Sequence, residues 1–222
     1  VEALLERGAQ RVYATARRLD SLPALVARAP ERVVPLQLDI TNAVQVTAAA
    51  ARAVDVNLLI NNAGVAAFSG FLNAPTLDGA RAEMEVNYWG QLAMIRAFAP
   101  ILRANGGGAI VQVLSIGALY CYPPSGTYSA SKFAANAMCH GLRVELAAQN
   151  TQLMSVFSGA IESDMSARTP GPKLSALTHA HNCLAALEDG QIEEFFPDFK
   201  AQRLRDEYRR DPEAFMRRFR NV

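Results

Sequence analysis

The chain has 222 residues, half of them hydrophobic, and a formal net charge of +1. This length and composition suit one well-packed domain, and the near-neutral charge argues against a nucleic-acid or membrane-surface binder. The longest apolar runs are strand-sized, and Glu2, Glu6 and Arg7 interrupt the apolar start, so we expect neither a membrane span nor a signal peptide.

Cysteine and histidine patterns exclude two further classes. Cys121, Cys139 and Cys183 are far apart and form no Cys-x-x-Cys pair, which favours reduced thiols in a cytoplasmic protein. His179 and His181 lie two residues apart, a spacing that fits no helical face, and no cluster of cysteines or carboxylates accompanies them. We therefore expect no metal site.

In chain order, helical and strand-like segments alternate. The first half predicts a helix ending at Gly8, a strand at 11–16, a short helix at 24–29, a strand at 33–38, a helix capped by Thr41 or Asn42 that ends at 53, and a strand at 56–60. The glycine that closes the first helix and the asparagine or threonine that opens the later one are typical helix boundaries.

The second half continues the alternation. It predicts a long helix at 78–104, a strand at 109–114, a helix at 127–149, a strand at 152–157, an irregular segment with a substrate loop at about 160–175, and an amphipathic C-terminal helix at about 200–222. Such alternation indicates a doubly wound parallel sheet between two layers of helices. We expect a three-layer α/β fold in a single domain that covers residues 1–222.

A tyrosine and a lysine four residues apart carry the clearest chemical signal. On a helix, the spacing of Tyr128 and Lys132 places a phenol and an ammonium on one face, about 5 to 6 Å apart at Cβ. The cation can favour the phenolate and lower the pKa of the tyrosine, which then serves as a general acid or base. Taken alone, such a pair is more often a solvated surface pair than a catalytic one.

Three more polar features accompany this pair. Ser115 follows the strand at 109–114, and the turn Asn61-Asn62-Ala63-Gly64 follows the strand at 56–60. Both therefore lie at the carboxyl edge of the sheet, where open α/β sheets bind ligands. Asn87 lies inside a helical pattern although asparagine is a poor helix former, so it needs another reason to be there.

In order and spacing, these motifs resemble the short-chain dehydrogenase/reductase family, over residues 1 to about 163. The resemblance implies a Rossmann-like fold and hydride transfer between a nicotinamide cofactor and a small carbonyl or alcohol. Tyr128 would be the acid or base, and Ser115 would hold the substrate oxygen. Lys132 would lower the pKa of Tyr128 and hold the nicotinamide ribose, and Asn87 would anchor a water chain that carries protons to solvent.

The resemblance also implies cofactor contacts along the carboxyl edge of the sheet. The residues implied are Asn61, Ala63, Gly64, Tyr128, Lys132, Gly159, Ile161 and Ser163. The last three belong to a segment similar to the family's Pro-Gly segment, which fixes the nicotinamide carboxamide. Here Ser158 stands where proline is usual and Ser163 where threonine is usual, which predicts a less rigid turn.

Cofactor choice is suggested by the residues after the strand at 11–16. Relatives that prefer NAD have an acidic residue there, whereas this chain has Arg17 and Arg18, which suit a 2′-phosphate. We therefore expect NADP, with NAD as the alternative, although both arginines could instead be solvated on a surface loop. Asp39 resembles the family's adenine contact, and it could equally be a strand-end cap.

The first strand and the glycine-rich turn of the family are missing from this sequence. Those elements bring backbone amides to the cofactor pyrophosphate, and Gly106, Gly107 and Gly108 are no substitute because they precede a strand. Without that strand, the strands at Arg11 and Asn57 would lose the partner between them. We expect an N-terminally truncated sequence; the alternative is a natural protein that lost its cofactor site.

The leading interpretation is an NADP-dependent carbonyl reductase or alcohol dehydrogenase that acts on a small molecule. Tyr122 and Phe157, beside the active residues, are expected to line an apolar substrate pocket together with Ser115, although such aromatics are often simply core. Family members commonly associate through the helices at 78–104 and 127–149, so we expect a homodimer or homotetramer. The alternative is a catalytically silent Rossmann-like binding or regulatory protein.

Overall fold

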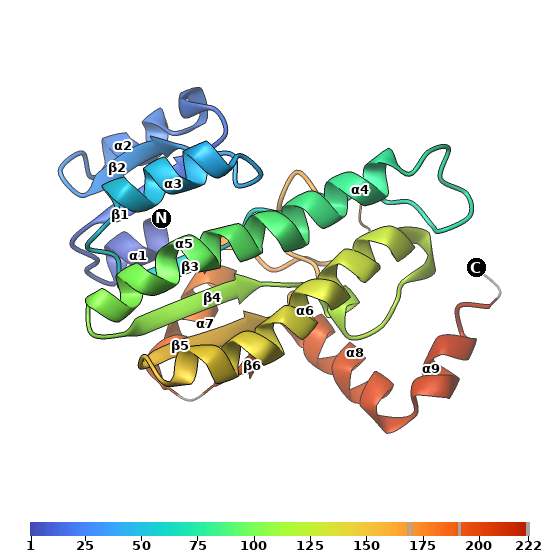
Figure 1. Cartoon of the computed structure of the whole chain (residues 1–222). Coiled ribbons are helices and arrows are strands. Elements are labelled where there is room, and N and C mark those ends of the chain that lie inside the picture. The colour runs from blue at the N-terminus through green and yellow to red at the C-terminus, as the bar shows by residue number, and fades with distance from the viewer. Residues whose placement is uncertain (168, 170, 191, 221–222) are drawn as a thin grey trace.

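The computed structural model describes residues 1–167, 169, 171–190 and 192–220 and is shown in Figure 1. In this part of the chain, β1 (Val12–Ala16) pairs in parallel with β2 (Val33–Gln37). A second parallel sheet has the order β3-β4-β5-β6 and consists of β3 (Leu58–Asn61), β4 (Gly108–Val113), β5 (Thr151–Val156) and β6 (Glu194–Phe195). The parallel α/β fold predicted from the alternation of elements is confirmed.

The two sheets are not joined to each other. Among the described strands, β1 is hydrogen-bonded only to β2, and the only strand partner of β3 is β4. In Figure 1, β1 and β2 lie with α2 (Pro23–Arg28) and α3 (Ala43–Arg52), to one side of the larger sheet. The interruption lies between the strands at Arg11 and Asn57, as the sequence predicts.

Helices cover both faces of the larger sheet. α5 (Gln91–Ala104) and α6 (Gly126–Ala147) pack on one face, in a core that includes Ile110 and Leu153. α7 (Ala176–Glu188) packs on the other face, where Cys183 contacts the cluster of Val111 and Met154. Neighbouring strand residues thus face opposite helical layers, as the pleat of a strand requires. α1 (Glu2–Glu6) lies against α7.

The long helix predicted at 78–104 is present but changes its winding in the middle. It consists of α4 (Asp78–Met84), a π-helical turn η2 (Glu85–Gly90) and α5. Asn87 lies inside the π turn. Such turns insert one residue into a helix and are frequent at functional sites, so the poor helix former at this position coincides with a real departure from α-helical geometry.

The helices differ from the sequence-based prediction in two places. α7 follows the expected substrate loop, in a part of the chain where no helix is predicted, and the Ser175 side chain caps it by accepting a hydrogen bond from the Thr178 amide. The predicted C-terminal helix is divided into α8 (Phe199–Arg210) and α9 (Pro212–Arg217). Proline is unfavourable inside a helix but favoured in its first turn. Pro212 accordingly lies at the start of α9, with Asp211 as its N-cap.

The remaining elements are short 3-10 turns that connect the larger ones. They are η1 (Leu19–Ser21), η3 (Ile116–Ala118) and η4 (Pro123–Ser125). Part of the expected substrate loop, residues 168 and 170, and the end of the expected C-terminal helix, residues 221–222, lie outside the described residues. None of the helices in the described part of the chain combines the length and apolarity needed to cross a membrane.

Candidate active site

Ser115 and Tyr128 meet at the carboxyl edge of β4. Ser115 begins the turn η3, and its Oγ accepts a hydrogen bond from the Gly117 amide at 3.1 Å. Tyr128 lies in the first turn of α6, and its hydroxyl is near enough to Ser115 for that side chain to lower the pKa of Tyr128. The structure therefore brings together two of the residues that the sequence assigns to the substrate oxygen.

Burial controls the protonation of Tyr128. It raises the pKa of Tyr128 to about 12, because the Ser115 hydrogen bond lowers it less than burial raises it, and the charge of Glu83 raises it further. The lowering of this pKa expected from Lys132 is not observed. Lys132 Nζ lies 5.8 Å from the centroid of the Tyr128 ring, and burial lowers the pKa of Lys132 itself to about 8. Tyr128 therefore keeps its proton at neutral pH.

Lys132 is almost completely buried and is directed toward the end of β4. Its side chain is 3% exposed, and Nζ donates a hydrogen bond to the Val113 carbonyl at 3.1 Å. A Cβ atom placed on Gly64 would lie 3.6 Å from Nζ and 3.3 Å from Asn87 Oδ1. Gly64 thus leaves a space beside the Lys132 ammonium and the Asn87 amide. A side chain at position 64 would make this space smaller.

The Asn87 side chain forms hydrogen bonds both to the segment after β3 and to α6. Its Oδ1 accepts a hydrogen bond from the Val65 amide, and its Nδ2 donates to the Val65 carbonyl and to Ser131 Oγ, each at 2.9 Å. The side chain has no exposed surface. These bonds give a structural reason for an asparagine in this helix, and its expected part in a water chain stays a prediction.

Asn61 does not have the position expected of a cofactor contact. Its side chain is 5% exposed and donates from Nδ2 to Gln112 Oε1 at 3.0 Å and to the Gln91 carbonyl at 3.3 Å. The side-chain amide of Gln91 in turn donates from Nε2 to the Ala63 carbonyl at 2.7 Å. Buried amides must satisfy one another, so Asn61 belongs to a network that shapes the turn at Ala63 and Gly64.

Gln91 is a site residue that the sequence reasoning missed. It is fully buried, and its hydrogen bond to Ala63 fixes a turn from which cofactor contacts are expected. The available signal is its spacing, because Gln91 follows Asn87 by four residues and therefore shares its helix face. A polar residue on the buried face of a helix needs a partner, and the turn after β3 supplies one.

Arg17, Arg18 and Asp39 lie at the carboxyl ends of β1 and β2. Both arginines are exposed, so their guanidinium groups are accessible to a ligand. Hydrogen bonds from Thr41 lower the pKa of Asp39, and the charge of Arg17 adds a smaller lowering. The Thr41 amide and hydroxyl reach Asp39 Oδ1 at 3.0 and 2.7 Å, as expected of the alternative in which Asp39 caps the end of its strand.

The segment after β5 is held by side chains from distant elements. The Gly159 amide donates to Asp198 Oδ2 at 2.8 Å, and the Ala201 amide donates to Asp198 Oδ1 at 2.8 Å. Further along, the Ser163 hydroxyl donates to the Ile161 carbonyl at 3.4 Å. The amide of Gly159 and the hydroxyl of Ser163, both in the set expected to contact the cofactor, thus have partners within the protein.

The aromatic residues expected in the substrate pocket divide into two groups. Phe157 has no exposed surface and stacks on Phe196 with ring centroids 4.9 Å apart. Its assignment to the substrate pocket is wrong, because two neighbouring buried rings form a core contact. Tyr122 is 42% exposed, and its ring lies 5.7 Å from that of Phe219, so it remains a candidate wall of the pocket.

The side chains at both ends of the carboxyl edge fit a dinucleotide. Arg17 and Arg18 supply cationic donors suited to a phosphate. Lys132 and the space left by Gly64 offer an ammonium donor and room at the other end. In open α/β proteins, such ligands bind beyond the carboxyl ends of the strands.

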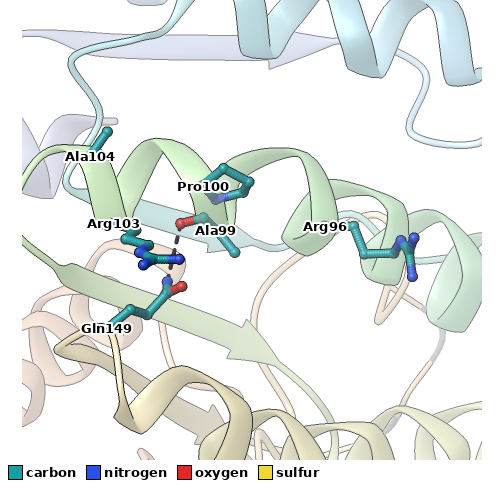
Figure 2. Close-up of a pocket in the computed structure, with 6 residues that line it drawn as sticks. All are labelled: Arg96, Ala99, Pro100, Arg103, Ala104 and Gln149. Carbon is teal, nitrogen blue, oxygen red and sulfur yellow. Dashed lines mark hydrogen bonds between the residues drawn. The ribbon is translucent and has the colours of Figure 1, made fainter.

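The hollow drawn in Figure 2 does not belong to this site. It has a volume of about 530 Å³ and is lined by five residues of α5 and one residue just beyond the end of α6: Arg96, Ala99, Pro100, Arg103, Ala104 and Gln149. Gln149 lies across it and donates from Nε2 to the Ala99 carbonyl at 3.1 Å. None of Ser115, Tyr128, Lys132 and Asn87 lines it, so we interpret it as a groove between helix ends.

Comparison with known proteins gives a consistent result. Residues 1–172 match the family model described as short chain dehydrogenase. The Penicillium crustosum short-chain dehydrogenase PC-15 is 35% identical over 157 residues, which cover 68% of this chain and 56% of that protein. The rat estradiol 17-beta-dehydrogenase 1 is 31% identical over 178 residues, 77% of this chain and 52% of that protein. The chain thus spans about half the length of these two curated relatives.

Solved structures agree with the fold. A short-chain dehydrogenase from Burkholderia cenocepacia, crystallised in complex with NADP, has a TM-score of 0.92 and 45% identity, and the match covers 99% of this chain and 90% of that one. A Sphingobium yanoikuyae short-chain dehydrogenase in complex with NADPH has a TM-score of 0.79 at 23% identity and covers 97% and 90%. The second likeness supports the fold alone.

Proposed function

The chain belongs to the short-chain dehydrogenase family, and we propose that it is an NADP-dependent oxidoreductase that interconverts a carbonyl and an alcohol. The observation that carries this proposal is the meeting of Ser115 and Tyr128 beside Lys132 at the carboxyl edge of β4. The cofactor would supply the hydride. The part of the protein is to place the reacting groups and to move one proton.

In this proposal, Ser115 and Tyr128 hold one substrate oxygen between them. Tyr128 donates its proton to a carbonyl oxygen as that oxygen gains negative charge, and Ser115 donates a hydrogen bond that orients the same oxygen. Lys132 lies on the same helix face, one turn further along. Its ammonium would hold the nicotinamide ribose in the space beside Gly64.

We propose that Tyr128 acts as the proton donor in carbonyl reduction. With a pKa of about 12, Tyr128 carries its proton across the physiological range and is ready to act as an acid. Oxidation of an alcohol would first require the phenolate, which burial disfavours. The Lys132 ammonium would have to approach the phenolate more closely before the reverse direction became efficient.

NADP is the proposed cofactor because of the two arginines after β1. Arg17 and Arg18 are exposed at the tip of the strand, and the similar Burkholderia cenocepacia structure was solved with NADP. Asp39 would contact the adenine, while Ala63, Gly64, Gly159, Ile161 and Ser163 would line the remainder of the cofactor site. Since the side chain of Asn61 lies within a buried amide network, we propose only its backbone for this role.

We propose a small-molecule substrate, a cytoplasmic location and a homodimer or homotetramer. Tyr122 would form one wall of the substrate site. The apolar side chains of Trp89 and Phe133, 52% and 40% exposed on η2 and α6, support association through the helices that the family commonly uses. An isologous interface would remove this apolar surface from water.

Replacement of Tyr128 by phenylalanine tests the proposal. The variant Tyr128→Phe removes the proton donor and keeps the ring, so we expect kcat to fall by at least about a hundredfold while NADPH affinity changes little. NADPH consumption by the full-length gene product would be measured against a panel of ketones and aldehydes. Retention of more than about a tenth of the wild-type kcat would contradict the assignment of Tyr128.

A further inference from the structure

Ser158, which stands where the family usually has proline, has a hydrogen-bond partner on α7. Its Oγ lies 2.8 Å from His179 Nε2. Ser158 is 8% exposed, and His179 is partly buried. A hydrogen bond in such surroundings restricts both side chains, because solvent cannot easily replace either partner.

The same serine is joined to the catalytic turn through its backbone. The Ile116 amide donates to the Ser158 carbonyl at 2.9 Å, and Ile116 directly follows Ser115. Ser115 in turn lies beside the Tyr128 hydroxyl, whose pKa it lowers. A continuous series of contacts therefore leads from His179 through Ser158 to the residue that would orient the substrate oxygen.

The next residue, Gly159, is fixed independently of His179. Its amide donates to Asp198 Oδ2, and a Cβ at this position would lie 2.5 Å from Asp198 Oδ1. Asp198 has both oxygens engaged, one by Gly159 and one by the N-terminus of α8. Asp198 thus locates the backbone of the segment, while the only side-chain hydrogen bond to Ser158 in the described structure comes from His179.

We propose that His179 is a positioning residue of the active site, which acts through Ser158 to hold both the segment that begins at 158 and the turn that carries Ser115. The hydrogen bond between the two side chains takes over the constraint that a proline ring would give by fixing φ. This inference rests on the proposed function, since it assigns residues 158–161 to the nicotinamide side of that site.

The expected effect follows from the loss of the hydrogen bond between His179 and Ser158; the contact of His179 with Cys183 Sγ, at 3.9 Å, is much longer. Such a bond contributes about 0.5 to 1.5 kcal/mol, which corresponds to about a two- to tenfold change in an equilibrium constant. In His179→Ala, we expect the Kd for NADPH to rise by about that factor. The Kd for adenosine 2′,5′-bisphosphate, which lacks the nicotinamide half, should stay within about twofold of wild type, because Arg17 and Arg18 lie elsewhere.

Two further variants separate positioning from general packing. His179→Gln keeps a polar group near the place of Nε2 and should recover most of the NADPH affinity. Ser158→Pro should make His179→Ala nearly silent in the double variant, since the ring restores the constraint. The Ser158 amide donates no hydrogen bond to any described residue, so a proline should not break a backbone contact there.

His181→Ala is the matched control on the same helix. His181 Nε2 lies 2.7 Å from Glu6 Oε2 and joins α7 to α1, away from Ser158. A packing role of α7 alone predicts similar effects of the two histidine variants on NADPH binding. The positioning role predicts an effect from His179→Ala only.

Amide hydrogen exchange gives a readout that needs no cofactor. In His179→Ala, the Ile116 amide should exchange about two- to tenfold faster, whereas exchange in the interior of β4 should be unchanged. Ser158→Pro in the same background should restore slow exchange at Ile116. These measurements use the full-length gene product and are independent of its turnover.

The outcomes distinguish this inference from the proposed function. Unchanged Ile116 exchange together with unchanged NADPH affinity in His179→Ala would overturn the positioning role, even if the wild-type enzyme is active. If His179→Ala does not fold, the double variant with Ser158→Pro should fold, and its failure to do so would also overturn the positioning role. Fast Ile116 exchange in both wild type and His179→Gln, together with equal NADPH binding by these two proteins, would overturn it as well. A wild-type protein that neither binds NADPH nor reduces carbonyls would refute the proposed function, and Ile116 exchange would still decide the role of His179.

Discussion

Replacing Lys132 by methionine should make the protein more stable near neutral pH while removing a proposed catalytic group. The side chain is 3% exposed, and burial lowers the pKa of Lys132 from 10.5 to about 8. At about 1.36 kcal/mol for each pH unit, that difference is a cost of about 3.4 kcal/mol for keeping the ammonium in the folded protein. Methionine has a similar length and carries no charge.

The expected gain is smaller than this cost, because Lys132 also satisfies the Val113 carbonyl at 3.1 Å. Leaving that acceptor without its donor costs about 1 to 3 kcal/mol. We therefore expect Lys132→Met to increase the free energy of unfolding by about 0.4 to 2.4 kcal/mol at about pH 7. Urea unfolding of the protein without cofactor is the measurement, and Lys200→Met, an exposed lysine in α8, should change it by less than about 0.5 kcal/mol.

The pH dependence gives the stricter test. The pKa of Lys132 is lower in the folded protein than in the unfolded chain, so between about 8 and 10.5 the unfolded chain binds more protons and wild-type stability rises with pH. Between about pH 7 and pH 9.5, wild type should gain about 2 kcal/mol relative to Lys132→Met. A variant that is less stable than wild type at pH 7 and follows the same pH profile would refute the assignment of a buried ammonium.

Two further substitutions test other parts of the site. Arg17→Asp should shift the ratio of kcat/KM from NADPH toward NADH, because it removes a phosphate partner and adds a repelling charge. The control Arg52→Asp changes an exposed residue at the end of α3, and equal ratios in the two variants would return Arg17 to the solvated surface. Gly159→Ala should destabilise the protein by about 1 to 3 kcal/mol in urea unfolding, since its Cβ would lie 2.5 Å from Asp198 Oδ1. Gly141→Ala, which meets no atom within 4 Å, should not, and a similar loss in both would show that the clash is unimportant.

The parts of the site predicted from sequence are those fixed by local geometry. The four-residue spacing of Tyr128 and Lys132 depends only on the helix that carries them, and Ser115 follows directly from the end of a buried strand. The break at Asp211 and Pro212 could also have been predicted, because proline after a capping aspartate is a helix start. The amphipathic pattern of residues 200–222 instead predicts one continuous helix, whereas the structure has a helix start at Pro212.

The parts that the sequence could not predict depend on contacts between distant elements. The orientation of the Asn61 amide is set by Gln91 and Gln112, which come from α5 and β4. The pKa of Tyr128 depends on how much of its hydroxyl is buried when α6 meets η3, and spacing along one helix does not report that. The bond between Ser158 and His179 likewise requires α7 to dock on the sheet.

The two unjoined sheets carry different parts of the proposed function. Ser115, Tyr128, Lys132 and Asn87 all come from the larger sheet and its helices, whereas Arg17 and Asp39 follow β1 and β2. The packing that connects them is a hydrophobic core in which Leu38, Val46 and Ala49 from the smaller unit contact Leu59, Met94 and Phe98 from the larger one. Closely packed cores transmit shifts between the elements that they join. A change in this core would therefore move the proposed 2′-phosphate site relative to the proposed catalytic residues, and we expect it to alter cofactor preference without changing the proposed proton donor, Tyr128.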